Sequence, residues 1–75
     1  MPTVYVGNGW KITMYFGDHN PPHFHVVTAD GEAKIRISDL SLMRGRISAR
    51  VLKDVRKWAA GNRALLETAW KECSE

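Results

Sequence analysis

The sequence predicts an α+β fold, in which a small antiparallel β-meander of four to five strands precedes a C-terminal helix packed on one sheet face. Up to residue 47, apolar residues recur at a period of two and are separated by turn-forming pairs. From residue 48 the apolar period changes to that of an amphipathic helix. With 75 residues there is room for one core. We therefore expect a single domain, 1–75, with the meander in 1–47 and the helical part in 48–73.

The first two strands are expected to form a hairpin. Thr3–Val6 is a short run of β-forming residues, and residues 7–9 supply two glycines and an asparagine for a turn. Across residues 10–16, apolar side chains alternate with Lys11, Thr13 and Tyr15. This alternation predicts a strand with one apolar face.

The meander is expected to continue beyond a proline corner. Residues 23–29 are β-forming, and the pair at residues 30–31, Asp-Gly, is a strong hairpin signal. Residues 33–38 again alternate between apolar and polar, and Asp39 permits a further bend. The segment 41–44 is short, so it leaves the strand count at four or five.

The C-terminal part carries an apolar stripe at helical spacing, and Ser48 is suited to cap its start. Gly61 would cost about 1 kcal/mol inside a helix and commonly ends one. The stripe nevertheless keeps its phase across Gly61, which favours one long helix kinked there over two separate helices. Such a helix would be about 37 Å long and would overhang the sheet. We then expect another chain to cover the overhanging part, at a protein interface formed by Leu65, Leu66 and Trp70.

Composition and charge are those of a soluble globular domain. Apolar residues make up 44% and charged residues 25%, with a formal net charge of +3. Cys73 is the single cysteine, so no intramolecular disulfide forms, which fits a reducing cytoplasm. Its position predicts an incidental thiol near a frayed terminus. No segment approaches the roughly 20 apolar residues of a membrane span, and the start does not resemble a signal peptide. We expect a cytoplasmic protein without membrane contact.

All three histidines lie around one pair of prolines, Pro21-Pro22. The prolines fix two successive φ angles and extend the preceding residue. This rigid corner is expected to deliver His23 and His25 to the start of a strand. Because they are two residues apart, their imidazoles should project from the same face.

Three interpretations of this cluster remain open. Imidazoles at this spacing could bind a divalent metal, with candidate ligands Asp18, His19, His23 and His25. Alternatively, His23 and His25 could act as a general acid–base pair on a phosphodiester. The third and most common role is structural, in which the rings hydrogen-bond the corner and stack on nearby aromatic side chains.

A row of basic residues follows the meander. It could contact nucleic acid or an acidic protein partner, or it could be an ordinary solvated helix face. In the sequence no aromatic residues are interleaved with the row, as a stacking platform for single strands would require. The candidate contact residues are Arg44, Arg46, Arg50, Lys53 and Lys57.

Residues 14–26, MYFGDHNPPHFHV, resemble the signature of a small bacterial family known as domain of unknown function four-one-six-zero. The resemblance extends from the first residue to Trp70. No catalytic residue can be carried over from this resemblance. It implies instead that the chain is one half of a two-gene unit, beside a second small protein, in an arrangement similar to a toxin–antitoxin pair.

We therefore expect an interaction module that binds a second small protein, self-associates, or does both. The alternative is a small histidine-dependent or metal-dependent hydrolase, such as a ribonuclease, that uses His23 and His25. In that case a divalent metal is the candidate cofactor, bound at the histidine cluster.

Overall fold

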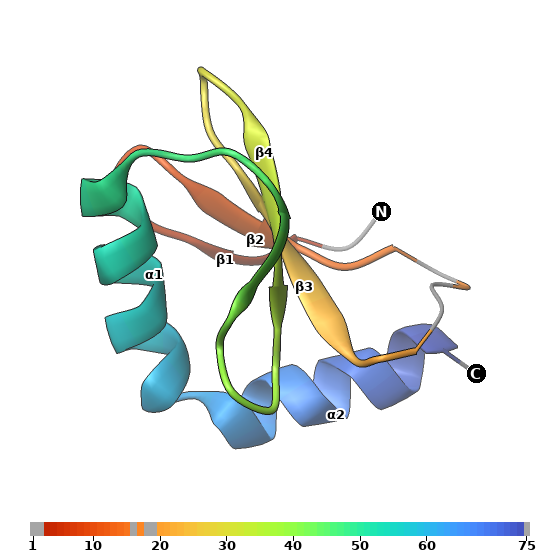
Figure 1. Cartoon of the computed structure of the whole chain (residues 1–75). Helices are drawn as coiled ribbons and strands as arrows, with labels where there is room; N and C mark the ends of the chain where they lie inside the picture. The colour runs from red at the N-terminus through yellow and green to blue at the C-terminus, as the bar shows by residue number, and fades with distance from the viewer. Residues whose placement is uncertain (1–2, 16, 18–19, 75) are drawn as a thin grey trace.

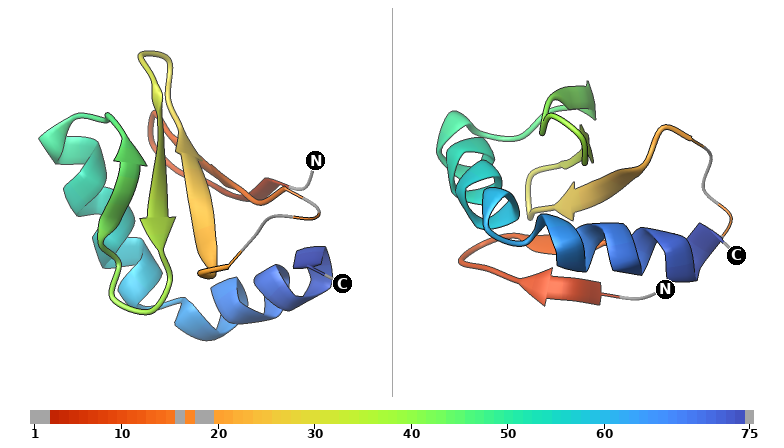
Figure 2. Two further views of the ribbon diagram at one scale, coloured as in Figure 1. Left: turned by 45° about the vertical axis from the view of Figure 1, so that its right-hand side comes forward. Right: turned by 90° about the horizontal axis from the view of Figure 1, so that it is seen from below.

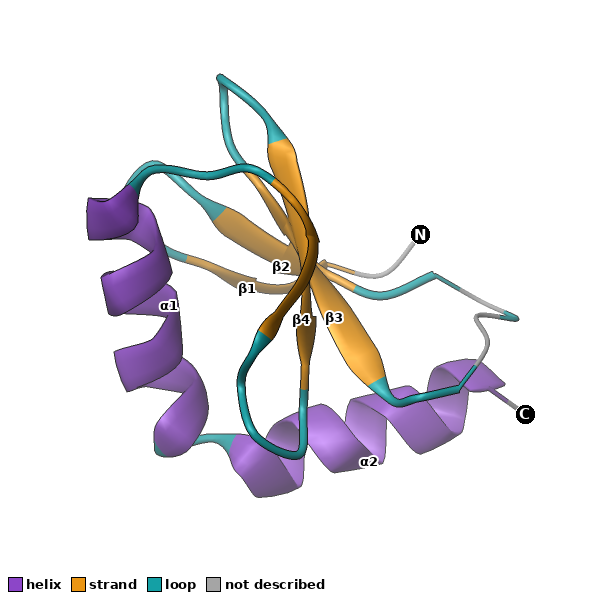
Figure 3. Cartoon of the chain, viewed as in Figure 1, coloured by secondary structure: helices purple, strands orange, loops and turns teal. Residues whose placement is uncertain are grey.

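The computed structural model describes residues 3–15, 17 and 20–74, and within them it confirms the α+β fold (Figure 1, Figure 3). Five antiparallel strands form one sheet in the order β1-β2-β3-β4-β5, and two helices follow. Among these residues no helix combines the length and the apolarity that crossing a membrane requires. The elements are β1 Thr3–Val6, β2 Lys11–Thr13, β3 His23–Val27, β4 Glu32–Arg36, β5 Leu42–Gly45, α1 Ala49–Ala60 and α2 Arg63–Ser74.

Strand register separates an apolar face of the sheet from a polar one. Ile12 pairs with Val26 across β2 and β3, and both side chains are completely buried. One residue further along, Thr13 pairs with His25, which in turn pairs with Lys34 on β4. Because successive side chains point to opposite faces, the apolar residues share one face and the polar row shares the other.

Helix α1 covers the apolar face. Its buried residues are Val51, Val55 and Ala59, which have the spacing of one helical stripe. The predicted cap is confirmed, since the backbone N–H of Val51 donates to Ser48 Oγ at 3.2 Å. This cap and stripe are the local reasons that the helix starts where it does and faces the sheet.

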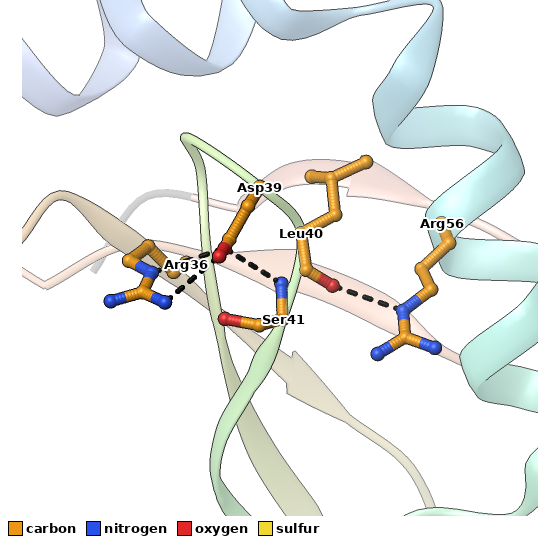
Figure 4. Close-up of polar contacts among 5 residues, drawn as sticks. All are labelled: Arg36, Asp39, Leu40, Ser41 and Arg56. Carbon is orange, nitrogen blue, oxygen red and sulfur yellow. Dashed lines mark hydrogen bonds and ion pairs between the residues drawn. The ribbon is translucent and has the colours of Figure 1, made fainter.

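The turn from β4 to β5 is built around Asp39, where the sequence predicts a bend (Figure 4). The Asp39 carboxylate accepts hydrogen bonds from Arg36 Nε and Nη2 at 3.0 and 2.8 Å, and one from the backbone N–H of Ser41 at 3.1 Å. These bonds hold the pKa of Asp39 well below its usual value, and the bond from Arg36 has the largest effect. Leu40 has a left-handed φ of 58°, and its carbonyl accepts a bond from Arg56 Nε of α1 at 3.0 Å. The turn is thereby tied to the helix.

The single long helix favoured by the sequence is replaced by two helices that meet at a corner (Figure 1, Figure 2). Three donors satisfy the last carbonyls of α1. Gly61 N–H and Asn62 Nδ2 both donate to Trp58 O, at 3.2 and 2.8 Å, and Asn62 N–H donates to Ala59 O at 3.0 Å. With those carbonyls satisfied, the chain can change direction at low cost. The stripe of apolar residues keeps its helical spacing across Gly61 because both helices face the same core.

The corner removes the predicted overhang. Helix α2 runs along the end of the sheet, where Leu66 is completely buried and Trp70 is 7% exposed. Of the three predicted interface residues only Leu65 is exposed. Cys73 is also buried, and its carbonyl accepts a hydrogen bond from Gly17 N–H at 3.1 Å, so this part of α2 is anchored rather than frayed.

Candidate functional site

The paired imidazoles on β3 lie where the sequence predicts. His23 and His25 project from the same face of the sheet, and their ring centroids are 5.2 Å apart. Both side chains are buried, at 4% and 5% exposure. They follow the proline corner, in which the Asn20-Pro21 peptide bond is cis. The other two candidate metal ligands, Asp18 and His19, lie outside the described residues.

Hydrogen bonds orient both rings through the same nitrogen. His23 Nδ1 lies 2.8 Å from the carbonyl oxygen of Pro21, and His25 Nδ1 lies 3.0 Å from Glu32 Oε2. A carbonyl or a carboxylate oxygen can only accept, so in each ring Nδ1 carries the proton. In the neutral form Nε2 is then the basic nitrogen of each ring. A carboxylate that fixes an imidazole in this tautomer is a recurring feature of bases and metal ligands.

Aromatic rings enclose the imidazole pair. Tyr15 makes an edge contact with His25 at a centroid separation of 4.3 Å, and Trp70 of α2 lies 5.1 Å from His23. Such contacts are those expected of structural imidazoles. Within residues 3–15, 17 and 20–74, no group of three or more His, Cys, Asp or Glu side chains is arranged to hold a metal ion.

The predicted basic row is exposed, but the fold divides it into two surfaces. Arg44 and Arg46 lie on or just after β5, whereas the other three residues lie on α1. We define the β5 surface as Lys34, Leu42, Met43, Arg44 and Arg46. We define the α1 surface as Tyr5, Arg50, Lys53, Lys57 and Trp58.

The β5 surface combines uncompensated positive charge with exposed apolar side chains. Lys34 and Arg44 are register partners on β4 and β5, and neither forms an ion pair with a described residue. They line a shallow cavity of about 310 Å³ whose one acidic residue, Glu32, is bonded to His25. On the same strand as Arg44, Leu42 and Met43 are 42% and 38% exposed, and Leu42 pairs with Ile35 of β4. Like charges placed directly across a strand pair are unfavourable.

The α1 surface contains an aromatic feature that the sequence analysis missed. Tyr5 of β1 stacks on Trp58 of α1, with ring centroids 4.6 Å apart and planes inclined by 24°. Trp10 packs against both rings, at 5.8 and 6.3 Å. Between the members of the basic row, residues 44–57, the sequence contains no aromatic residue. The missing signal was Tyr5 at the opposite end of the chain, which no local pattern connects to Trp58.

Residues 9–71 match the family described as Domain of unknown function (DUF4160). No curated protein and no solved structure matches the chain significantly. The family match covers most of the chain and includes the histidine and proline signature. This chain therefore belongs to the DUF4160 family, as the resemblance of residues 14–26 predicts.

Proposed function

We propose that the chain is a protein-interaction module, one component of a two-protein, toxin–antitoxin-like system, and that the β5 surface binds an acidic partner. The observation that carries this proposal is the pairing of Lys34 with Arg44, on a strand that also exposes Leu42 and Met43. An acidic side chain of a partner would offset the repulsion between the two cations. Burial of the neighbouring apolar side chains would contribute affinity.

The size of the chain also favours a partner. A domain of 75 residues buries roughly 60% to 65% of its unfolded surface, so its own stability is small. A partner that binds only the folded state raises that stability by mass action. A two-protein system of the kind implied by the family resemblance would supply such a partner continuously.

The test is titration calorimetry with the protein encoded by the neighbouring gene. We expect Arg44→Glu and Met43→Ser each to weaken binding by at least about ten-fold, which corresponds to about 1.4 kcal/mol. Lys53→Glu is the matched control, because it makes the same charge change on the α1 surface. Absence of a complex, or equal losses in all three variants, would contradict the proposal.

The bond between His25 and Glu32 supports a second candidate, a small ribonuclease. In that reaction one of His23 and His25 would take the proton of the ribose 2′-hydroxyl, and the other would protonate the leaving oxygen. We expect His25→Gln and Glu32→Gln to abolish RNA cleavage without changing the circular dichroism spectrum. If the wild-type protein leaves RNA intact with and without added zinc, nickel or magnesium, this candidate is rejected.

A further inference from the structure

A stacked pair of aromatic rings borders a line of cations on the α1 surface. Tyr5 pairs in register with Ile12, so its side chain points to the sheet face that α1 covers. There it stacks on Trp58, and Trp10 supports both rings from the side. Tyr5 nevertheless remains 41% exposed. The result is an aromatic ring that is backed by other rings, on a residue that is partly exposed.

The cations follow the helix beside this ring. Arg50, Lys53 and Lys57 are three and four residues apart, which places them in one line along α1. All three are exposed, and Trp58 directly follows the last of them in sequence. The Arg50 guanidinium also lies next to Gly9, in the turn that connects β1 to β2. At Arg50, the line of charge therefore adjoins the hairpin that carries Tyr5.

Little negative charge offsets this line. Arg50 Nη1 donates to Asp54 Oδ2 at 3.0 Å, on the same helix. Lys53 and Lys57 form no ion pair with any residue that the structure describes. Lys53 and Lys57 thus remain available to an external anion on the exposed side of α1.

We propose that the α1 surface binds single-stranded nucleic acid. The phosphates would follow Arg50, Lys53 and Lys57, and one unpaired base would stack on the exposed ring of Tyr5. Every base has a π-face, so such a platform accepts any sequence, whereas the cations attract the backbone. An acidic protein would neutralise the cations, but its binding would not require the Tyr5 ring that stacks on Trp58. A duplex is disfavoured because its bases are already stacked on one another.

The test is fluorescence anisotropy of labelled oligouridylate and oligodeoxythymidylate at several salt concentrations. The two probes distinguish RNA from DNA as the source of the strand. We expect Tyr5→Leu to weaken binding by about ten-fold, whereas Tyr5→Phe keeps the ring and the affinity. Lys53→Ala and Lys57→Ala should each reduce the slope of log K against log salt by about 0.7.

The controls separate a specific surface from general charge. Arg63→Ala removes one exposed cation from α2 and should leave the slope nearly unchanged. Thermal melting of each variant checks that Tyr5→Leu still folds, since Tyr5 contacts Trp10 and Trp58. Failure of the wild-type protein to bind either probe would overturn the proposal. So would equal affinity for a duplex or for polyglutamate, or binding that Tyr5→Leu leaves unchanged.

Discussion

Thr13 is a completely buried side chain whose hydroxyl has no hydrogen-bond partner in the described structure. Thr28, at the hairpin between β3 and β4, is the opposite case. Its Oγ1 accepts from the N–H groups of Asp30 and Gly31 and donates to the carbonyl of Gly31, at 3.0 to 3.2 Å. An unsatisfied buried hydroxyl lowers stability, whereas a satisfied one contributes to it.

The first prediction compares these two threonines. Thr13→Val removes an unpaired hydroxyl with little change of shape, so we expect the free energy of unfolding to rise by about 1 kcal/mol. Thr28→Val removes three hydrogen bonds of a turn, so we expect the free energy of unfolding to fall by about 1 to 2 kcal/mol. Urea unfolding followed by circular dichroism measures both. A loss of stability in Thr13→Val would mean that its hydroxyl is satisfied after all.

The second prediction concerns Asp39 and acid. Its pKa is depressed in the folded state by the hydrogen bonds from Arg36 and Ser41. A depressed carboxyl pKa contributes stability that is fully present above the unfolded value of 3.8 and is lost as the pH falls below it. We therefore expect Asp39→Asn to melt at a lower temperature than the wild-type protein near neutral pH. On acidification, its melting temperature should fall by less than that of the wild-type protein. Parallel melting curves for the two proteins from pH 5 to pH 2 would be inconsistent with this role.

At the scale of elements, the corner between α1 and α2 depends on Asn62 more than on the glycine before it. Gly61 has a φ of −89°, in the ordinary right-handed region, and an added Cβ would meet only Trp58 O, at 3.7 Å. Gly45 differs, since its φ is 90° and an added Cβ would collide with the backbone of Glu32. Of these two glycines, only Gly45 therefore requires the absence of a side chain.

The third prediction follows from this difference. Gly61→Ala should raise the free energy of unfolding by about 0.5 to 1 kcal/mol, because it restricts the unfolded chain and fits the native conformation. Gly45→Ala should lower it by more than that amount. Backbone chemical shifts of Gly61→Ala should still show two helices. One continuous helix in that variant would show that the glycine, and not the Asn62 bonds, makes the corner.

At the scale of the whole molecule, α2 completes the core at the end of the sheet. Leu66 and Trp70 are buried there, and Trp70 contacts the imidazole of His23. The backbone bond from Gly17 to Cys73 ties the segment before the proline corner to the same helix. The signature residues and the C-terminal helix thus form one structural unit, although they lie in different halves of the sequence.

The fourth prediction tests this unit with two adjacent leucines. Leu66→Ala should cost about 2 to 5 kcal/mol, because the side chain is completely buried. Leu65→Ala should change stability by less than about 0.5 kcal/mol, because that side chain is 47% exposed. Chemical denaturation of both variants measures the difference. Similar losses would indicate that the exposed side of α2 is also covered, for example by a second copy.

Strands, turns and the first helix cap could be predicted from the sequence because they depend on neighbouring residues. Alternation over a few positions specified the faces of β2 and β4, and the Asp30-Gly31 pair specified the hairpin between β3 and β4. The same-face arrangement of His23 and His25 followed from strand geometry alone.

The helix corner, the burial of Trp70 and the Tyr5–Trp58 stack were decided by tertiary structure. A periodic stripe reports which side of a helix is apolar, but its phase is the same whether the axis continues or turns to follow the core. Likewise, no local pattern joins β1 to α1. The amino-acid sequence by itself therefore determined the strands, the turns and the apolar faces, whose energetics are local. Only packing around the shared core decided their directions and the surfaces they form together, because those depend on contacts between distant segments.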